Sequence, residues 1–163
     1  MDNPFEYLHT YWRMEYVQAI KNNDTDKLFA ELPKTDNDEE ALIILRDQYT
    51  YLVLNRFPYN PGHLLLVPYR EVPDLKDLSN EERLEFFNNI IRAQDILTKA
   101  LKPHGFNIGF NLGKAAGAGI PNHLHGHIVP RWTGDTNFMP VIGHTKTLAT
   151  SLGLMWKQLK AHC

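Results

Sequence analysis

Three histidines at every second position are the feature of this chain that most restricts how it can fold. His123, His125 and His127 are separated by single residues, and an Ile-Val pair follows them. Successive side chains on a strand point to opposite faces, so residues two apart lie on one face, roughly 7 Å from each other. The β-branched pair favours a strand, and Pro121 and Pro130 bound the run on either side. We therefore predict an extended segment that presents three imidazoles on one face, because a helix would scatter them around its axis.

A row of imidazoles is compatible with two kinds of chemistry. Three neutral ring nitrogens can hold a catalytic zinc ion. One histidine can instead act as a nucleophile, and crowding helps because like charges nearby lower the pKa of each ring and keep the attacking nitrogen neutral. A chance cluster of solvated histidines is the third interpretation, although alternation with leucine, glycine and isoleucine is typical of a half-buried strand. The spacing alone leaves the zinc site and the nucleophile open.

The composition of the chain limits its partners and its compartment. With 163 residues, 43% of them hydrophobic, the chain is long enough for one domain with a sizeable core. The formal net charge is only −2, so bulk electrostatics indicate neither nucleic acid nor a membrane surface as a partner. Cys163 is the only cysteine, which excludes an intrachain disulfide and fits a reducing compartment. No apolar run approaches about 18 residues and no signal-peptide pattern is found, so we expect a cytoplasmic protein.

Apolar periodicity and turn signals predict an α+β domain with a five-stranded antiparallel sheet and one long helix. The helix is expected to start at a capping box formed by Ser79 and Glu82 and to end before Pro103. Its apolar stripe, expected to pack on the sheet, consists of Leu84, Phe87, Ile90, Ile91, Ile96 and Leu97. The predicted strands cover residues 41–45, 49–55, 63–68, 106–112 and 123–129.

Shorter helices are predicted at both ends of the chain. Residues 11–20 carry an aromatic stripe at helical spacing, and a closing helix is expected over 147–160. We expect one domain over 1–163, with a core at about 40–140 and both terminal segments packed on it.

The loop before the histidine row is rich in small residues. Residues 113–121 contain three glycines and three alanines. Such a loop lets backbone N–H groups approach a phosphate closely. It is not a Walker loop, because no Gly-Lys-Ser/Thr follows. By itself the loop would be an ordinary hairpin connection, but its position directly before three histidines favours phosphate binding.

Two sequence blocks resemble the histidine triad superfamily of nucleotide hydrolases and transferases. Residues 123–129 fit its His-x-His-x-His-x-x signature, and residues 55–68 (NRFPYNPGHLLLVP) are similar to its first strand pair. Residues 130–140 (PRWTGDTNFMP) and 12–16 (WRMEY) are similar to the branch that contains diadenosine tetraphosphate phosphorylases. Many relatives carry a zinc-binding Cys-x-x-Cys pair after the latter motif. Residues 22–29 contain no cysteine, so we expect no structural zinc there.

The resemblance implies a role for each residue of the site. The middle histidine, His125, would attack the α-phosphorus and carry the nucleotide transiently. His123 and His127 would orient it and hydrogen-bond the phosphate and leaving oxygens, with His63 behind them, and Asn55 would bind the ribose hydroxyls. The remaining expected substrate-binding residues are Leu54 and Leu65 at the base, Asn111 at the phosphates, Trp132, and Gly117, Ala118, Gly119, Ile120 and Pro121 in the loop.

The activity implied by the resemblance is cleavage of dinucleoside polyphosphates through a nucleotidyl-histidine. We expect phosphorolysis of diadenosine tetraphosphate to ATP and ADP. Arg131 could supply charge for the acceptor phosphate, although an arginine after a strand is more often an exposed residue or a structural ion-pair partner. The open alternatives are hydrolysis to ATP and AMP or phosphoramidase activity in the same superfamily, a three-histidine zinc hydrolase, and a nucleotide-binding module with weak turnover. We expect no cofactor in the protein, Mg²⁺ arriving only with the nucleotide, and a homodimer or higher homo-oligomer.

Overall fold

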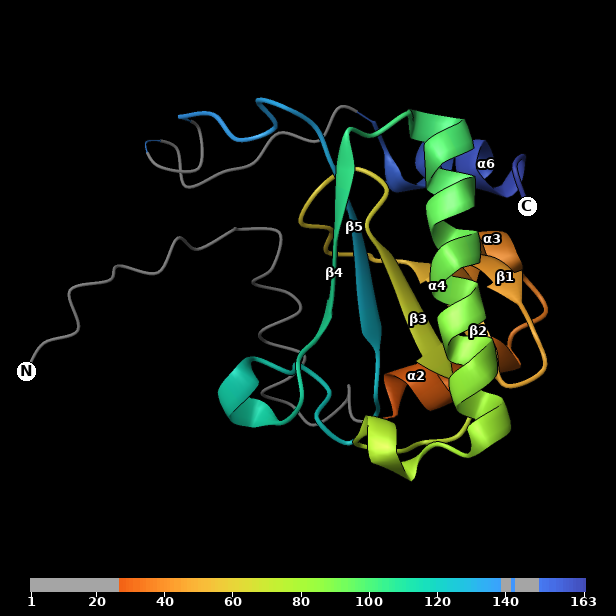
Figure 1. Ribbon diagram of the computed structural model, residues 1–163. Coiled ribbons are helices and arrows are strands. Elements are labelled where there is room, and N and C mark those ends of the chain that lie inside the picture. The colour runs from red at the N-terminus through yellow and green to blue at the C-terminus, as the bar shows by residue number, and fades with distance from the viewer. Residues whose placement is uncertain (1–26, 139–141, 143–149) are drawn as a thin grey trace, which may run out of the picture.

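In the part of the chain that the structure describes, five strands form one antiparallel sheet and the long helix α4 lies across one of its faces (Figure 1). The computed structural model describes residues 27–138, 142 and 150–163. The strand order β1-β2-β3-β5-β4 places β5 between β3 and β4, and it confirms the predicted α+β architecture. The strands are β1 Ile43–Arg46, β2 Thr50–Leu54, β3 Leu64–Pro68, β4 Gly105–Phe110 and β5 Gly126–Arg131. The helices are α2 Leu28–Glu31, α3 Asp38–Ala41, α4 Asn80–Leu101 and α6 Leu152–Lys160, with 3-10 turns η2 Leu32–Lys34, η3 Leu75–Asp77 and η4 Lys114–Ala116.

The predicted capping box starts α4. The Ser79 hydroxyl accepts the Glu82 backbone N–H (3.2 Å), and the Glu82 carboxylate accepts the Ser79 backbone N–H (2.7 Å). Two amide groups that the helix start would leave without a partner are satisfied in this way. The helix ends at Lys102, which adopts the left-handed conformation with φ 49° just before Pro103. Both predicted boundaries are confirmed.

The predicted packing face of α4 is wrong for half of its residues. Leu84, Phe87 and Ile91 are 66%, 62% and 58% exposed, respectively. The helix buries two polar residues in their place: the Asn89 amide donates to the Thr50 hydroxyl (2.9 Å), and the carboxylate of Glu82 accepts from its N-cap and from an arginine. Because these polar groups have hydrogen-bond partners, they can be buried at little cost. The helix face that packs on the sheet is therefore rotated about the helix axis relative to the predicted apolar stripe. The apolar residues that do pack inward are Phe86, Ile90, Ala93, Ile96 and Leu97.

The histidine row is not one continuous strand. β5 begins only at Gly126, so His127 lies on the strand while His123 and His125 precede it. The backbone before β5 is held elsewhere, since Leu124 N–H donates to the carbonyl of residue 72 (2.6 Å). Pro130 lies inside β5 rather than after it. It is tolerated because pairing with β3 stops at residue 128, so no partner on that side requires its N–H.

The C-terminal helix begins later than predicted. α6 starts at Leu152 with the Ser151 hydroxyl accepting the Leu154 N–H (3.4 Å), so the described residues 150–151 precede the helix. Residues 147–149, where the closing helix was expected to begin, lie outside the described residues. The helix predicted over residues 11–20 also lies outside them.

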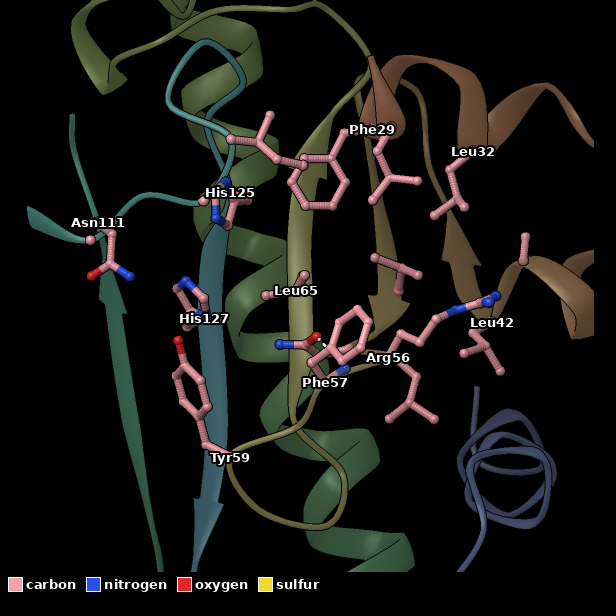
Figure 2. Close-up of a pocket in the computed structure, with 18 residues that line it drawn as sticks. Phe29, Leu32, Leu42, Arg56, Phe57, Tyr59, Leu65, Asn111, His125 and His127 are labelled. Carbon is pink, nitrogen blue, oxygen red and sulfur yellow. Dashed lines mark hydrogen bonds between the residues drawn. The ribbon is translucent and has the colours of Figure 1, made fainter. Parts of the chain in front are cut away.

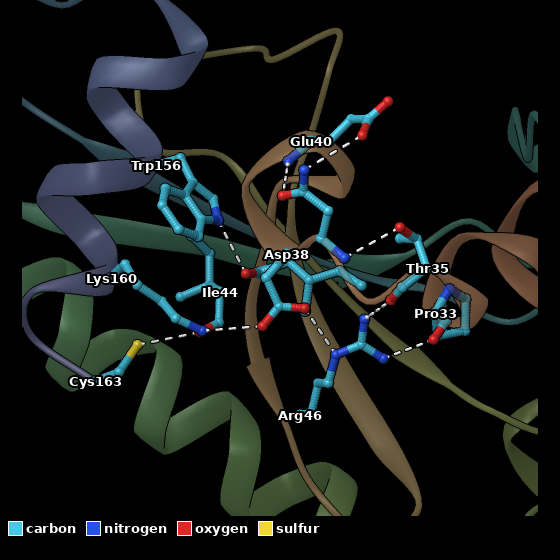
Figure 3. A network of polar contacts seen from close by, with 11 residues as sticks. Pro33, Thr35, Asp38, Glu40, Ile44, Arg46, Trp156, Lys160 and Cys163 are labelled. Carbon is cyan, nitrogen blue, oxygen red and sulfur yellow. Dashed lines mark hydrogen bonds and ion pairs between the residues drawn. The ribbon is translucent and has the colours of Figure 1, made fainter.

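A polar network fastens α6 to β1 (Figure 3). The Trp156 indole N–H donates to a β1 carbonyl (2.9 Å), and the Lys160 ammonium donates to the next carbonyl (3.0 Å). The ammonium also contacts Asp38 (3.2 Å), whose other oxygen accepts from Arg46 (2.8 Å). These contacts close the sheet edge farthest from β5. No helix among the described residues is long and apolar enough to span a bilayer.

Candidate active site

A cavity of about 450 Å³ opens on the face of the sheet away from α4 (Figure 2). Its floor includes three residues that pair across adjacent strands, Val53 on β2, Leu65 on β3 and His127 on β5. Directly paired residues point to the same face, so the sheet register brings the third histidine beside the apolar floor. The full lining consists of Leu28, Phe29, Leu32, Ala41, Leu42, Val53, Leu54, Asn55, Arg56, Phe57, Tyr59, Leu65, Asn111, Gly117, Gly119, Ile120, His125 and His127.

The larger part of the cavity is apolar. Phe29 on α2 forms one wall, and the buried Tyr51 hydroxyl holds that segment by donating to the Phe29 carbonyl (2.7 Å). The Phe29 ring also lies 5.0 Å from the His125 ring, so the apolar wall reaches the histidines. An apolar pocket with a few polar groups at one end is the usual form of a small-molecule site.

The contacts of His125 place its ring proton on Nδ1 and leave Nε2 without a proton. Its Nδ1 lies 2.8 Å from the carbonyl oxygen of His123. A carbonyl can only accept, so Nδ1 carries the proton and Nε2 is bare in the neutral ring. Burial lowers the pKa of His125, outweighing the carbonyl bond, which acts in the opposite direction. The ring is therefore neutral near pH 7, with a lone pair suited to nucleophilic attack.

His127 is held with the opposite tautomer. The backbone N–H of Tyr59 donates to His63 Nδ1 (3.1 Å), so the His63 proton is on Nε2. That nitrogen lies 3.0 Å from His127 Nδ1, which must accept. A neutral His127 therefore carries its proton on Nε2 and is a hydrogen-bond donor there. The His125 and His127 rings are 5.2 Å apart, so an attacking lone pair and a donor N–H lie side by side.

His123 lies behind His125 and not at the cavity, where it was expected to contact the phosphate. Its Nε2 donates to the Pro68 carbonyl (2.8 Å), and the residue is fully buried and outside the cavity lining. Burial is the main cause that lowers its pKa. His123 therefore anchors the segment whose carbonyl fixes the tautomer of His125. His63 lies behind His127, where it was expected.

The structure brings most of the predicted substrate-binding residues together. Seven of them line the cavity: Leu54, Asn55, Leu65, Asn111, Gly117, Gly119 and Ile120. Ala118 and Pro121 belong to the same loop but are outside the lining. Gly117 has φ 89°, a left-handed conformation that glycine adopts without strain.

Trp132 and Arg131 do not lie with the others. They are at the opposite end of β5 from His127, and neither lines the cavity. Two guanidinium nitrogens of Arg131 donate to Asp135 (2.6 and 2.8 Å). Of the two roles considered for Arg131, the structure shows the ion pair with Asp135 and not a place at the acceptor phosphate. At about 3.3 Å per residue, Arg131 lies far along the strand from His125.

Sequence reasoning missed one wall of the cavity and one neighbour of the histidines. The wall comes from α2 and η2, which were assigned to an irregular amino-terminal segment. The neighbour is Tyr59, whose ring is nearly parallel to that of His127 (13°, centroids 5.7 Å apart). Its place four residues before His63, in the block that resembles the family, was a signal that went unused.

The three histidines do not form a shared ligand set. Each donates or accepts through one ring nitrogen within the protein, to a carbonyl or to another ring. Among the described residues, no group of three or more His, Cys, Asp or Glu side chains is arranged to hold a metal ion.

Known proteins match this chain over most of its length. The HIT domain model matches residues 36–134. An AP-4-A phosphorylase of Mycobacterium tuberculosis is 47% identical over 148 residues, covering 86% of this chain and 75% of that protein. A solved Zn-bound histidine triad family protein from Mycobacterium smegmatis has a TM-score of 0.65 at 24% identity, covering 83% of this chain and 90% of that one. A hypothetical histidine triad nucleotide-binding protein from Sulfolobus tokodaii has a TM-score of 0.66 at 20% identity, with the same two coverages, and these two structures confirm the fold.

Proposed function

This chain belongs to the HIT domain family, and we propose that it cleaves diadenosine tetraphosphate by phosphorolysis, producing ATP and ADP. The observation that carries the proposal is the pair of opposite tautomers on His125 and His127. Splitting a phosphoanhydride needs an attacking lone pair and a donor for the departing oxygen. The two neighbouring rings supply one each.

In the first step, the bare Nε2 of His125 attacks the α-phosphorus. An N–P bond forms, the bond from the α-phosphorus to the bridging oxygen breaks, and its electron pair leaves with ATP. The Nε2–H of His127 hydrogen-bonds the departing oxygen and can give it a proton. The adenosine moiety occupies the apolar end of the cavity, with Asn55 near the ribose and Phe29 along the base wall.

In the second step, an oxygen of inorganic phosphate attacks the same phosphorus. The N–P bond breaks, its electron pair returns to His125 Nε2, the proton of the attacking phosphate goes back to His127 Nε2, and ADP is released. Backbone N–H groups of the loop at Gly117 and Gly119 are suited to hold the phosphate oxygens, because no side chain stands in the way. Mg²⁺ would arrive with the nucleotide.

The test determines whether inorganic phosphate or water accepts the nucleotide from His125. Purified protein is incubated with diadenosine tetraphosphate and labelled inorganic phosphate, and the products are separated. Label in ADP, formed in step with ATP, is the expected result. AMP formed at one rate with and without phosphate would mean that water is the acceptor and that the protein is a hydrolase of the same superfamily.

The zinc hydrolase and the weakly active binding module are less well supported. The proton positions on His125 and His127 assign the rings to two different tasks, whereas a zinc site needs their bare nitrogens to converge. We expect elemental analysis to find no stoichiometric zinc. One zinc per chain, lost together with activity in His123→Ala, would favour the metal site, and tight binding without product would favour the module.

We also propose a homodimer in a reducing cytoplasm. β4 is an edge strand, and its backbone can pair with the same strand of a second copy. Ile108 on this strand is 39% exposed, and the outer side of α4 exposes Leu84, Phe87 and Ile91. Light scattering should give twice the mass of the chain, and Phe87→Glu should shift the protein toward monomer. A monomeric wild-type protein would contradict the proposal.

A further inference from the structure

Tyr59 occupies the side of His127 that faces away from His125. The three rings follow one another, with 5.2 Å between the centroids of His125 and His127 and 5.7 Å between those of His127 and Tyr59. Tyr59 lines the cavity and is 39% exposed. In Figure 2 its hydroxyl points toward His127, on the side where Asn111 also lies. The base end of the cavity is on the other side, with Phe29 and Leu32.

The side chains of Tyr59 and Tyr51 lie in different surroundings. Tyr51 is fully buried, and its hydroxyl donates to the carbonyl of Phe29. The backbone N–H of Tyr59 donates to His63 and sets the proton position on that ring. The side chain of Tyr59 lines the cavity and is 39% exposed, so a ligand in the cavity can contact it.

The chemistry of the second step places the acceptor next to this hydroxyl. The acceptor enters where the leaving oxygen departed, and that oxygen is the one that His127 Nε2–H contacts. An inorganic phosphate there needs neutral or positive donors and no nearby carboxylate. The lining residues at this end, Asn111 and Tyr59, are neutral donors, and the described lining of the cavity contains no Asp or Glu.

We infer that the Tyr59 hydroxyl donates a hydrogen bond to the acceptor phosphate beside His127, and so favours phosphate over water as the acceptor. This inference rests on the proposed phosphorolysis. It assigns Tyr59 a contact with the second substrate. The dinucleotide places its departing phosphate at the same position in the first step, but its base and ribose are held at the apolar end, so it depends less on that contact.

The test is Tyr59→Phe, which keeps the ring stack on His127 and the backbone N–H to His63. Steady-state kinetics are measured with diadenosine tetraphosphate at fixed saturation and inorganic phosphate varied, and the ADP and AMP products are counted. We expect the KM for phosphate to rise about tenfold, the size of one lost hydrogen bond to a charged group. The AMP share at low phosphate should exceed that of wild type. The KM for the dinucleotide should rise less than the KM for phosphate, and the kcat at saturating phosphate should stay within about twofold.

Two further variants separate the hydroxyl from the ring. Tyr49→Phe removes a hydroxyl that accepts from Gln48 outside the cavity, and it should leave all parameters unchanged. Tyr59→Leu removes the stack as well, so it should lower kcat in addition to raising the KM for phosphate.

The possible results distinguish the inference from the proposed function. If wild-type protein makes ADP and Tyr59→Phe has an unchanged KM for phosphate, the inference is wrong and the function stands. A fall in kcat alone in Tyr59→Phe would also overturn it, since the hydroxyl would then act on the histidines. If wild-type protein makes no ADP at all, the function and the inference fail together.

Discussion

The two ends of β5 carry polar groups of opposite kinds. At the start of the strand, His125 presents a bare ring nitrogen and His127 presents a ring N–H at the cavity. At its far end, Arg131 and Asp135 are both charged, and they satisfy each other through two hydrogen bonds. Both ends belong to the stretch that resembles the family. Only the start of the strand lines the cavity, so only that end can contact a ligand there.

The far end supports the site indirectly. The Asp135 carboxylate also accepts from the Asn60 amide (2.8 Å), and that amide donates to the Pro130 carbonyl (2.9 Å). Asn60 is adjacent to Tyr59 and close to His63, so the ion pair holds the loop that sets the tautomer of His127. This difference leads to predictions of unequal size for the two ends.

The largest effect is expected for His125→Ala. Loss of the nucleophile should lower turnover by about three orders of magnitude or more, while the fold is retained. His104→Ala is the matched control, because His104 contacts Thr133 near the far end of β5 and should keep near-native turnover. A folded His125→Ala protein with native turnover would contradict the proposed covalent mechanism.

Asp135→Asn should affect stability far more than chemistry. Losing the charged acceptor of Arg131 should cost about 1–3 kcal/mol of unfolding free energy, with turnover within about threefold of wild type. Asp95→Asn on the exposed side of α4 serves as the control. A thousandfold loss of turnover in a folded Asp135→Asn protein would contradict the division between the two ends.

The stabilisation by Asp135 should depend on pH. The hydrogen bond from Arg131 holds the pKa of Asp135 well below its usual range. Since the folded pKa is lowered, the contribution is complete above the unfolded pKa of about 3.9 and is lost as the pH falls through the folded value. Thermal unfolding of wild type and Asp135→Asn should therefore differ at pH 7, and the difference should begin to shrink only as the pH falls below about 4. A constant difference would show that ionisation of Asp135 contributes nothing.

The smallest effect concerns the acid limb of the activity. Burial lowers the pKa of His125, so its lone pair should remain available below pH 6.5. The acid limb of kcat/KM for the dinucleotide should accordingly lie below that value. A midpoint above pH 6.5 would mean that His125 is more easily protonated than its buried position implies.

Local signals in the sequence were sufficient for much of the fold. The capping box of Ser79 and Glu82 predicted the start of α4, and Lys102 before Pro103 its end. The buried face of α4 could not be predicted from local signals, because burial of Asn89 depends on Thr50, a partner 39 residues away. The start of β5 at Gly126 likewise depends on where β3 ends its pairing.

The site was predictable where a residue type alone indicates its chemistry. Three alternating histidines predicted a site of imidazoles, and the resemblance indicated His125 as the nucleophile and located Asn55, Leu65 and Asn111. Phe29 could not be found this way, because the Tyr51 hydroxyl that holds its segment is distant in sequence. The proton positions also required the structure, since they depend on which carbonyl or amide each ring nitrogen meets.

The most direct test of the two-ring mechanism is the proton position on each imidazole. Nitrogen-15 NMR of uniformly labelled protein at neutral pH distinguishes protonated from bare ring nitrogens, with assignment through His125→Ala. The geometry predicts a proton on Nδ1 and a bare Nε2 in His125, and a bare Nδ1 with a proton on Nε2 in His127. A proton on Nε2 of His125 would contradict the assignment of this ring as the nucleophile.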